Sequence, residues 1–374
     1  MQVKFLDLQL INESYGKPLT DAACDTIQSG WYLRGRQTEA FEREWGDYCQ
    51  APYAVAVGNG LDALRLVLQA WKILLKWNDG DEVIVPANTF IATPLAVSQA
   101  GLRPVFCDVN LSDALISTEV SHLESLLSPR TRCIIPVHLY GQLANLDVIY
   151  TFAAKHGLQV LEDTCQAHGA RSIYNNVYNR TCAYSFYPGK NLGALGDGGC
   201  VTTSDRELSA LVRSLANYGQ AEKYIHDYQG VNSRLDELQA AILRVKLRHL
   251  DADNHRRREI ASFYASELSE LHSEADSICQ QPAITDGSHV YHIFPFLTNH
   301  RTQIQQYLNS KEIQTLCHYP IACHKQKAYS SENTQTIPNA EFWCTHELSL
   351  PISPVLTDEQ AEYVVASIRA FHQQ

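Results

Sequence analysis

The sequence contains no cysteine pair of the Cys-x-x-Cys type, although it has 11 cysteines. Such pairs are typical of zinc and redox sites, and an odd number of scattered cysteines argues against a framework of disulfides. We therefore interpret the cysteines as small hydrophobic side chains that are buried in the core.

Basic residues are scarce relative to acidic ones. The chain has 30 Lys and Arg against 41 Asp and Glu, which gives a formal net charge of -11. General binding to nucleic acid or to anionic membranes requires a basic face, so the composition argues against both kinds of partner. Any phosphate group on a ligand must then be held by local groups.

Long apolar runs are also missing. No segment approaches the roughly 18 apolar residues that a membrane span needs. The opening segment MQVKFLDLQLINESYGKP carries Asp7 and Glu13 and lacks both a basic start and an uninterrupted apolar core. It does not resemble a secretory signal, so we expect a cytoplasmic protein.

Short apolar runs that alternate with helix-like segments fill the first two thirds of the chain. YAVAVGNG is followed by LDALRLVLQAWKILL, which has a helical period, and the same order recurs at EVIVPANTF and at CIIPVHLYG. This rhythm predicts an α/β fold with a mostly parallel sheet that is covered on both faces. In such sheets, ligands bind at the carboxyl ends of the strands.

The length of 374 residues, 45% of them hydrophobic, allows one large core and one smaller core. After Leu235, the stretch DELQAAILRVKLRHLDADNHRRREIASFYASEL is compatible with a helix throughout and contains neither Gly nor Pro. We expect it to lead from a large domain, residues 1–250, into a small C-terminal domain, residues 251–374.

Lys190 and Asp163 are the two residues whose surroundings suggest chemistry. Lys190 lies in SFYPGKNLGALGDGG, where a tight turn with few bulky side chains could desolvate and fix an amine that forms a Schiff base. Asp163 ends an apolar strand and could keep the ring nitrogen of a pyridoxal cofactor protonated. The alternatives are a solvated surface lysine and an aspartate that caps a helix.

The turn Gly58-Asn59-Gly60 precedes a predicted helix and offers backbone N–H groups to a phosphate. This signal is weak by itself, because many strand-to-helix turns contain two glycines. A nicotinamide cofactor is disfavoured, since the full Gly-x-Gly-x-x-Gly pattern is absent.

Six segments together carry a resemblance to a known family. They are GNGLDALRLVLQA, GDEVIVPANTFIAT, IIPVHLYGQ, EDTCQAHGA, SFYPGKNLGALGDGG and GVNSRLDELQAAIL. In this order and spacing, the chain resembles the DegT/DnrJ/EryC1/StrS sugar aminotransferases over nearly its whole length. The resemblance implies the aspartate-aminotransferase fold (fold type I), pyridoxal 5'-phosphate as cofactor, and a homodimer with active sites at the interface.

The resemblance also assigns roles to residues around the cofactor. Lys190 is expected to form the Schiff base, Asp163 to pair with the ring nitrogen, and Gln166 to lie near the 3-hydroxyl. Phe90 is expected to cover the ring face, although it could be an ordinary core residue. The phosphate contacts would come from Ser185, the backbone of Gly60 and Leu61, and Asn232 of the other subunit.

Substrate contacts are implied for Tyr187, Arg234, His318, Tyr319 and His324. The last three belong to TLCHYPIACHKQKAY, which is similar to a family segment close to the active site. Arg234 could equally orient the interface loop or form a structural ion pair. Two histidines at this spacing could suggest a metal, but no carboxylate or cysteine cluster completes such a site, so we expect none.

The activity implied by the resemblance is transfer of an amino group from L-glutamate to a dTDP-3-keto-6-deoxyhexose, in the formation of amino sugars for a polysaccharide or a natural product. Enzymes that aminate carbon 4 usually have histidine where Tyr187 stands, so amination of carbon 3 is favoured. Amination of carbon 4 remains one alternative. A regulator that binds ligands without turnover is another, although the intact Lys190 and Asp163 argue against it.

Overall fold

The computed structural model describes residues 1–171, 179–269, 287–329 and 335–373. All cysteines within these ranges are free thiols, and six of them are buried. Cys24 is exposed, whereas Cys49, Cys165 and Cys317 are half-buried. The interpretation as buried hydrophobic groups is therefore correct for most described cysteines and wrong for Cys24, while Cys279 lies outside the described residues.

The centre of the molecule is a mixed sheet whose two halves meet at Gln159–Asp163. β5 pairs with β4 and β6 pairs with β7, all in parallel. Between them, Leu161 N donates to Ile134 O at 3.1 Å and Asp163 N donates to Pro136 O at 2.9 Å, so the ladder continues across. The strands are β1 (Tyr53–Val57), β2 (Glu82–Pro86), β3 (Arg103–Cys107), β4 (Thr131–Ile134), β5 (Gln159–Val160), β6 (Glu162–Asp163), β7 (Thr181–Ser185) and β8 (Gly199–Thr203).

The strand order across this sheet is β3-β2-β4-β5, continued by β6-β7-β8-β1. β8 runs antiparallel to both of its neighbours, and the other pairings are parallel. The prediction of a mostly parallel α/β sheet is confirmed. The antiparallel β8 is the one feature of this sheet that the alternating apolar runs did not indicate.

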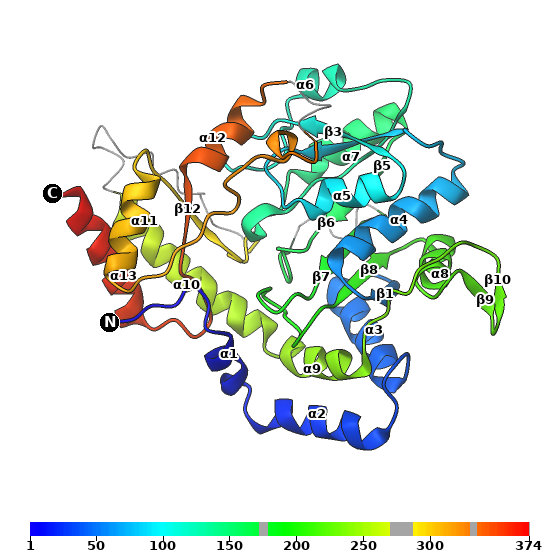
Figure 1. The fold of residues 1–374 in the computed structure, drawn as a ribbon, viewed down its shortest axis with the longest axis horizontal. Coiled ribbons are helices and arrows are strands. Elements are labelled where there is room, and N and C mark those ends of the chain that lie inside the picture. Colours follow the sequence, from blue (N-terminus) through cyan, green and yellow to red (C-terminus); the bar gives the residue numbers. More distant parts are fainter. Residues whose placement is uncertain (172–178, 270–286, 330–334, 374) are drawn as a thin grey trace.

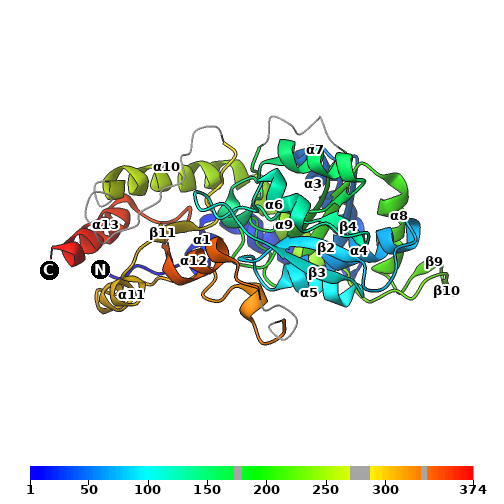
Figure 2. The same ribbon diagram turned by 90° about the horizontal axis from the view of Figure 1, so that it is seen from above.

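Helices cover both faces of the sheet, as predicted. They are α3 (Arg36–Cys49), α4 (Gly60–Leu74), α5 (Ala92–Gln99), α6 (Val120–Ser125), α7 (Leu146–His156) and α8 (Arg206–Leu215). Val83 and Val85 join the core beneath α4, α5 and α8, whereas Ile84 between them joins the core beneath α6 and α7. In Figure 2, α7 and α5 lie on opposite sides of the strands. Alternate side chains of a buried strand therefore face two different cores.

The stretch after Leu235 is two helices rather than one. α9 (Glu237–Leu247) ends before His249, and α10 (Leu250–Leu268) begins in a new direction. Nothing in the local sequence breaks the helix, because Gly and Pro are absent. The two halves face different cores: Leu243 packs with α3, whereas Tyr264 packs in a second core.

This second core lies to one side of the sheet (Figure 1). It is built from α10, the antiparallel pair β11 (Phe294–Leu297) and β12 (Glu347–Leu350), α11 (Arg301–Ser310) and α13 (Asp358–His372). Val3 of the opening segment joins it, while Trp343 of α12 (Pro338–His346) belongs to the large core. The chain thus crosses between the two cores more than once, and the division at residue 250 stays a prediction.

Three elements extend from the periphery. α1 (Leu8–Ser14) and α2 (Lys17–Ser29) run along the lower edge in Figure 1, and α2 packs on α9. The hairpin of β9 (Gln220–Glu222) and β10 (Ile225–His226) projects from the sheet side in both ribbon views. Among the described helices, none combines the length and apolar character needed to cross a membrane.

Candidate active site

The loop that carries Lys190 follows β7 and is fixed on all sides. Lys190 N donates to Tyr187 O at 2.8 Å, which closes the turn. Asn191 Nδ2 donates to Asn254 Oδ1 at 2.8 Å and to Val290 O at 3.0 Å. Leu192 N donates to the ring of His168 at 3.3 Å. The lysine is therefore presented from a rigid loop at the carboxyl end of a strand, where α/β sheets bind ligands.

The Lys190 ammonium is half-buried, and it has no ion-pair partner among the described residues. Burial lowers its pKa below the ordinary value, and the nearby Cys165 and Asp163 only partly oppose this. A lower pKa makes the neutral amine more available, and the neutral amine is the form that acts as nucleophile or base.

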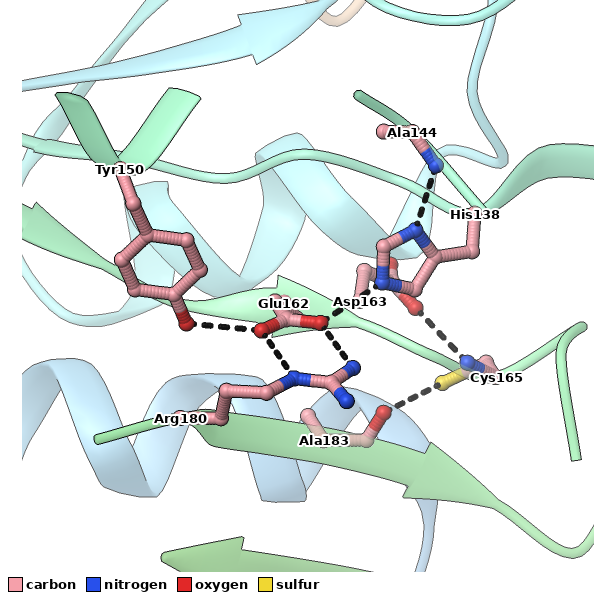
Figure 3. Close-up of polar contacts among 8 residues, drawn as sticks. All are labelled: His138, Ala144, Tyr150, Glu162, Asp163, Cys165, Arg180 and Ala183. Carbon is pink, nitrogen blue, oxygen red and sulfur yellow. Dashed lines mark hydrogen bonds and ion pairs between the residues drawn. The ribbon is translucent and has the colours of Figure 1, made fainter. Parts of the chain in front are cut away.

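Asp163 is buried at the end of β6, on the same face as Leu161 of the large core. Its carboxylate accepts the hydroxyl of Thr93 at 2.8 Å and the backbone N–H of Cys165 at 3.2 Å. Figure 3 shows the Cys165 contact. Both donors are neutral, and no described cation forms an ion pair with this carboxylate. A buried carboxylate that lacks a cation favours a positively charged ligand atom beside it.

Glu162, the other residue of β6, faces the opposite side of the sheet (Figure 3). Arg180 donates to both of its oxygens, at 2.8 and 2.5 Å, and His138 and Tyr150 bind it at 2.8 and 2.7 Å. Burial alone would raise its pKa, but Arg180 and His138 hold the pKa of Glu162 well below the usual range. Glu162 is thus a fully compensated structural anion.

Gln166 links two other parts of the chain. Its Oε1 accepts the backbone N–H of Tyr140 at 2.6 Å, and its Nε2 donates to the hydroxyl of Tyr319 at 3.1 Å. The Tyr319 ring in turn lies 5.3 Å from the ring of Phe90. Phe90 is 52% exposed, so the reading as an ordinary core phenylalanine is wrong. Its face is available to a planar ligand.

The start of α4 lies against Ser185. A Cβ on Gly60 would lie 2.5 Å from Ser185 Cβ, so only glycine permits this approach. Asn59 caps the helix by accepting the N–H of Asp62 at 2.8 Å. The N–H groups of Gly60 and Leu61 have no acceptor in the described part of the chain. These N–H groups and the nearby hydroxyl form a phosphate-binding arrangement.

Asn232 and Arg234 flank Ser233, whose hydroxyl accepts the N–H of Gly58 at 2.9 Å. Asn232 is exposed and forms an isolated bridge with Asn217. Arg234 lies over the ring of Tyr218 at 5.6 Å, and its guanidinium is 3.5 Å from Asn217 Oδ1. No ion pair involves Arg234 in the described residues, so the structural ion pair is not the role found. Their roles toward a partner subunit or substrate stay predictions.

The predicted substrate residues fall into two groups. Tyr187 is exposed next to the Lys190 turn, and His318 lies in the electrostatic field of Lys190. His324 is buried, with Nε2 3.0 Å from Glu341, and no described contact joins it to the Lys190 loop. His324 gains no support as a substrate contact. Within the described ranges, no group of three or more His, Cys, Asp or Glu side chains could hold a metal ion.

Several residues of the site were not predicted from the sequence. Thr93 binds Asp163, Tyr140 binds Gln166, and His168 holds the Lys190 loop while it packs between Phe186 and Tyr184. Burial and Lys190 lower the pKa of His168 to about 3, so its ring is neutral. Thr93 and His168 stand inside the quoted segments GDEVIVPANTFIAT and EDTCQAHGA, which was the only available signal.

The assembled groups fit pyridoxal 5'-phosphate. They provide an amine of lowered pKa, a buried carboxylate without a cation, an exposed aromatic face and free N–H groups at a helix start. These four features match what an aldehyde, a pyridinium nitrogen, a planar ring and a phosphate each require.

Comparison with known proteins agrees with this arrangement. The chain is 45% identical over 387 residues to dTDP-3-amino-3,6-dideoxy-alpha-D-galactopyranose transaminase of Aneurinibacillus thermoaerophilus, covering 99% of both. It is 43% identical over 382 residues to the erythromycin biosynthesis sensory transduction protein EryC1 of Saccharopolyspora erythraea, covering 99% of this chain and 100% of that protein.

A solved structure extends the comparison to three dimensions. NtdA of Bacillus subtilis, crystallised with the cofactor PMP bound, superposes with a TM-score of 0.92 at 30% identity, covering 100% of this chain and 86% of that one. The model of the DegT/DnrJ/EryC1/StrS aminotransferase family matches residues 14–369. Together with the site around Lys190, these findings show that the chain belongs to the DegT/DnrJ/EryC1/StrS aminotransferase family.

Proposed function

We propose that this chain is a cytoplasmic aminotransferase that moves the amino group of L-glutamate to carbon 3 of a dTDP-3-keto-6-deoxyhexose. The product is a dTDP-3-amino-3,6-dideoxyhexose. The observation that carries the proposal is that a lysine of lowered pKa and a buried carboxylate with only neutral donors occur in one site. Pyridoxal 5'-phosphate, held by Lys190, would supply an electron sink when bound.

Each residue of the candidate site has a separate role in binding the cofactor or moving a proton. Lys190 anchors the cofactor, and its freed amine then moves the proton that converts donor to acceptor and back. Asp163 stabilises positive charge on the ring nitrogen. Phe90 and Gln166 orient the ring from its face and its edge, while Gly60 and Ser185 hold the phosphate. The fold leaves the Phe90 ring exposed and the Asp163 carboxylate with neutral donors only, whereas Gln166 is already hydrogen-bonded at both ends.

Carbon 3 is preferred to carbon 4 for two reasons. Tyr187 stands at the position where enzymes acting on carbon 4 usually have histidine, and the Aneurinibacillus relative is named for a 3-amino sugar. Steady-state assays with the isomeric 3-keto and 4-keto sugars would separate the two activities. Exclusive turnover of the 4-keto sugar would contradict the assignment to carbon 3.

A regulatory role without turnover is the second candidate, because one relative is named as a sensory transduction protein. A pure binding protein does not require a desolvated amine beside a carboxylate that lacks a cation. The visible absorption spectrum discriminates the two roles. We expect glutamate to abolish the band of the lysine-bound cofactor and the keto sugar to restore it, with no such band in Lys190→Ala.

We also propose that the protein acts as a homodimer with Asn232 reaching the partner's phosphate. Exposed aromatic side chains support a covered surface around this region: Trp31, Tyr32, Tyr187, Tyr218 and Tyr224. Mixing Asn232→Ala with Lys190→Ala tests this directly, because a hybrid dimer would contain one site with both native residues. We expect the mixture to regain activity. A mixture that is no more active than the two variants alone would contradict a shared site.

A further inference from the structure

A chain of three polar groups runs from β12 to the candidate site. His318 Nδ1 lies 2.8 Å from Ser349 Oγ, and the Ser349 hydroxyl donates to Glu347 Oε1. Glu347 Oε2 accepts the backbone N–H of His318 at 2.7 Å, which closes the unit. Glu347 and Ser349 are two positions apart on one strand, so their side chains share a face.

The two ends of this chain differ in exposure. Glu347 is 1% exposed and Ser349 is fully buried, whereas His318 is half-buried. The imidazole stacks on Phe5 at 5.7 Å, and its backbone carbonyl accepts the hydroxyl of Tyr140 at 2.7 Å. His318 Nε2 has no partner in the described residues and is the ring nitrogen left for a ligand.

Tyr140 connects this unit to the cofactor site. Its backbone N–H donates to Gln166, while its hydroxyl donates to His318. Tyr319, the residue after His318, binds the other end of Gln166. The position of the imidazole is therefore tied to the residue expected beside the cofactor ring.

The charges around the unit favour neutral forms of its members. Burial lowers the pKa of His318 to about 4, and Lys190 adds to this effect. Burial raises the pKa of Glu347 to about 8, against weaker opposing effects of the hydrogen bonds from Ser349 and the His318 N–H and of the charge of Arg301 on α11. The other titratable groups that interact with the unit are Tyr140, His292, Cys317, Tyr319 and Cys344. An imidazolium at His318 is thus disfavoured, while Glu347 can take up a proton near neutral pH.

We propose that Ser349 and Glu347 form a proton relay that lets His318 exchange one proton with the sugar substrate at Nε2 without becoming a cation. When Nε2 gains a proton, Nδ1 passes its proton to Ser349 Oγ, and the Ser349 proton moves to Glu347 Oε1. One N–H forms at Nε2 and one O–H forms at Glu347, while the carboxylate charge disappears. Release of the proton reverses each transfer.

This relay rests on the proposed function, in which His318 contacts the sugar. Glu347 and Ser349 are positioning residues, since they act only through His318. The protonation state of Glu347 then decides whether Nε2 is a hydrogen-bond acceptor or donor.

Infrared difference spectroscopy on the cofactor-free protein tests the relay independently of turnover. We expect the wild type to show a protonated carboxyl band that disappears as the pH rises through about 8. Glu347→Gln should lack this band, and Ser349→Ala should shift it because the carboxyl loses its hydroxyl partner. A band that persists unchanged in both variants would overturn the relay.

Kinetics supply the second test. In Ser349→Ala and Glu347→Gln, we expect the step with the keto sugar to slow by about 10²-fold, the low end of the range for general acid–base catalysis, with KM nearly unchanged. The change of rate near pH 8 should also vanish. Thr298→Val is the matched control, because Thr298 is fully buried after β11 and its hydroxyl binds only His300 N, at 3.0 Å, among the described residues.

Equal rates and pH profiles in the relay variants and in Thr298→Val would refute the relay and leave a structural cluster. A wild type that does not turn over the keto sugar would instead refute the proposed function. The infrared titration would still decide whether Glu347 and Ser349 share a proton.

Discussion

Glu162 and Asp163 are adjacent carboxylates on one short strand, yet their hydrogen-bond and ion-pair partners differ. Glu162 has a bidentate arginine, a histidine and a tyrosine around it, and all of them donate hydrogen bonds to it or carry opposing charge (Figure 3). Asp163 has a threonine hydroxyl and one backbone N–H. Because side chains of a strand alternate, a single step along β6 separates a carboxylate that binds an arginine from one that has only neutral donors.

The difference shows that a buried carboxylate without a cationic partner is a candidate for ligand binding. A buried carboxylate is costly unless a cation or several donors compensate it. Glu162 is compensated inside the chain and needs no ligand. Asp163 is compensated only by neutral donors, which is what the proposed contact with a cationic ring nitrogen requires.

The largest contrast should come from removing the charge of Asp163. We expect Asp163→Asn to slow the half-reaction with glutamate by about 10²- to 10³-fold, the scale found when a preorganised electrostatic group is lost. The free energy of unfolding of the cofactor-free protein should change by at most about 1–2 kcal/mol, because Thr93 still has an acceptor. Single-turnover absorbance and urea denaturation measure the two effects. Equal losses of stability in Asp163→Asn and Glu162→Gln would contradict the claim that Glu162 contributes more to the stability of the fold than Asp163 does.

Glu162→Gln should show the reverse pattern. It removes the carboxylate charge that Arg180 contacts at 2.8 and 2.5 Å, so we expect a loss of about 3–5 kcal/mol in the free energy of unfolding. The rate per folded molecule should stay within about threefold of the wild type, since Glu162 faces away from the site. Glu124→Gln is the control, because Glu124 pairs with Lys155 at 2.7 Å on the exposed surface and should change neither quantity.

A smaller effect is expected at Thr93, which joins Asp163 to α5. Thr93→Val removes a hydrogen bond to a charged group, which is worth about 1.5–3 kcal/mol and corresponds to a roughly tenfold or larger fall in the half-reaction rate. Thr181→Val is the matched control, since Thr181 forms a buried hydroxyl pair with Thr203 at 3.0 Å. Similar rates in both variants would mean that Thr93 does not tune Asp163.

The pH dependence of stability gives the finest distinction. The pKa of Glu162 is lowered from 4.5 in the fold, so the unfolded chain takes up a proton below about pH 4.5 while the folded chain does not. Its stabilising contribution is present above this pH and is lost as the pH falls. The stability difference between wild type and Glu162→Gln should therefore be largest near neutral pH and shrink in acid. A difference that is constant with pH would contradict the assignment.

Local patterns predicted much of the fold and the main residues of the site. The apolar runs and helical periods gave β1 with α4, β2 with α5 and the span of α7, because these elements are both buried and locally regular. Lys190 and Asp163 were found from their own surroundings, whereas the roles of Gln166 and Phe90 came from the family resemblance. Their neighbours in space, Thr93 and Tyr140, are ordinary residue types, and their only signal was a place inside the family-like segments GDEVIVPANTFIAT and IIPVHLYGQ.

Other features depended on contacts between distant segments. The break between α9 and α10 has no local cause, and it follows from packing against two different cores. The relay of His318, Ser349 and Glu347 joins two segments about 30 residues apart through the bridge from Leu316 to Ser349. Hydrogen bonds of this kind become visible only when strand pairing sets the register.

The order of residues along the chain thus determined the α/β class and singled out Lys190 and Asp163 as candidates, because burial and turn chemistry act over a few neighbouring positions. The three-dimensional arrangement alone decided that Glu162 is neutralised while Asp163 is not, that β8 runs against its neighbours, and that His318 is backed by a buried carboxyl. These outcomes depend on which distant side chains meet within hydrogen-bonding distance, and that is set by the packing of the whole chain.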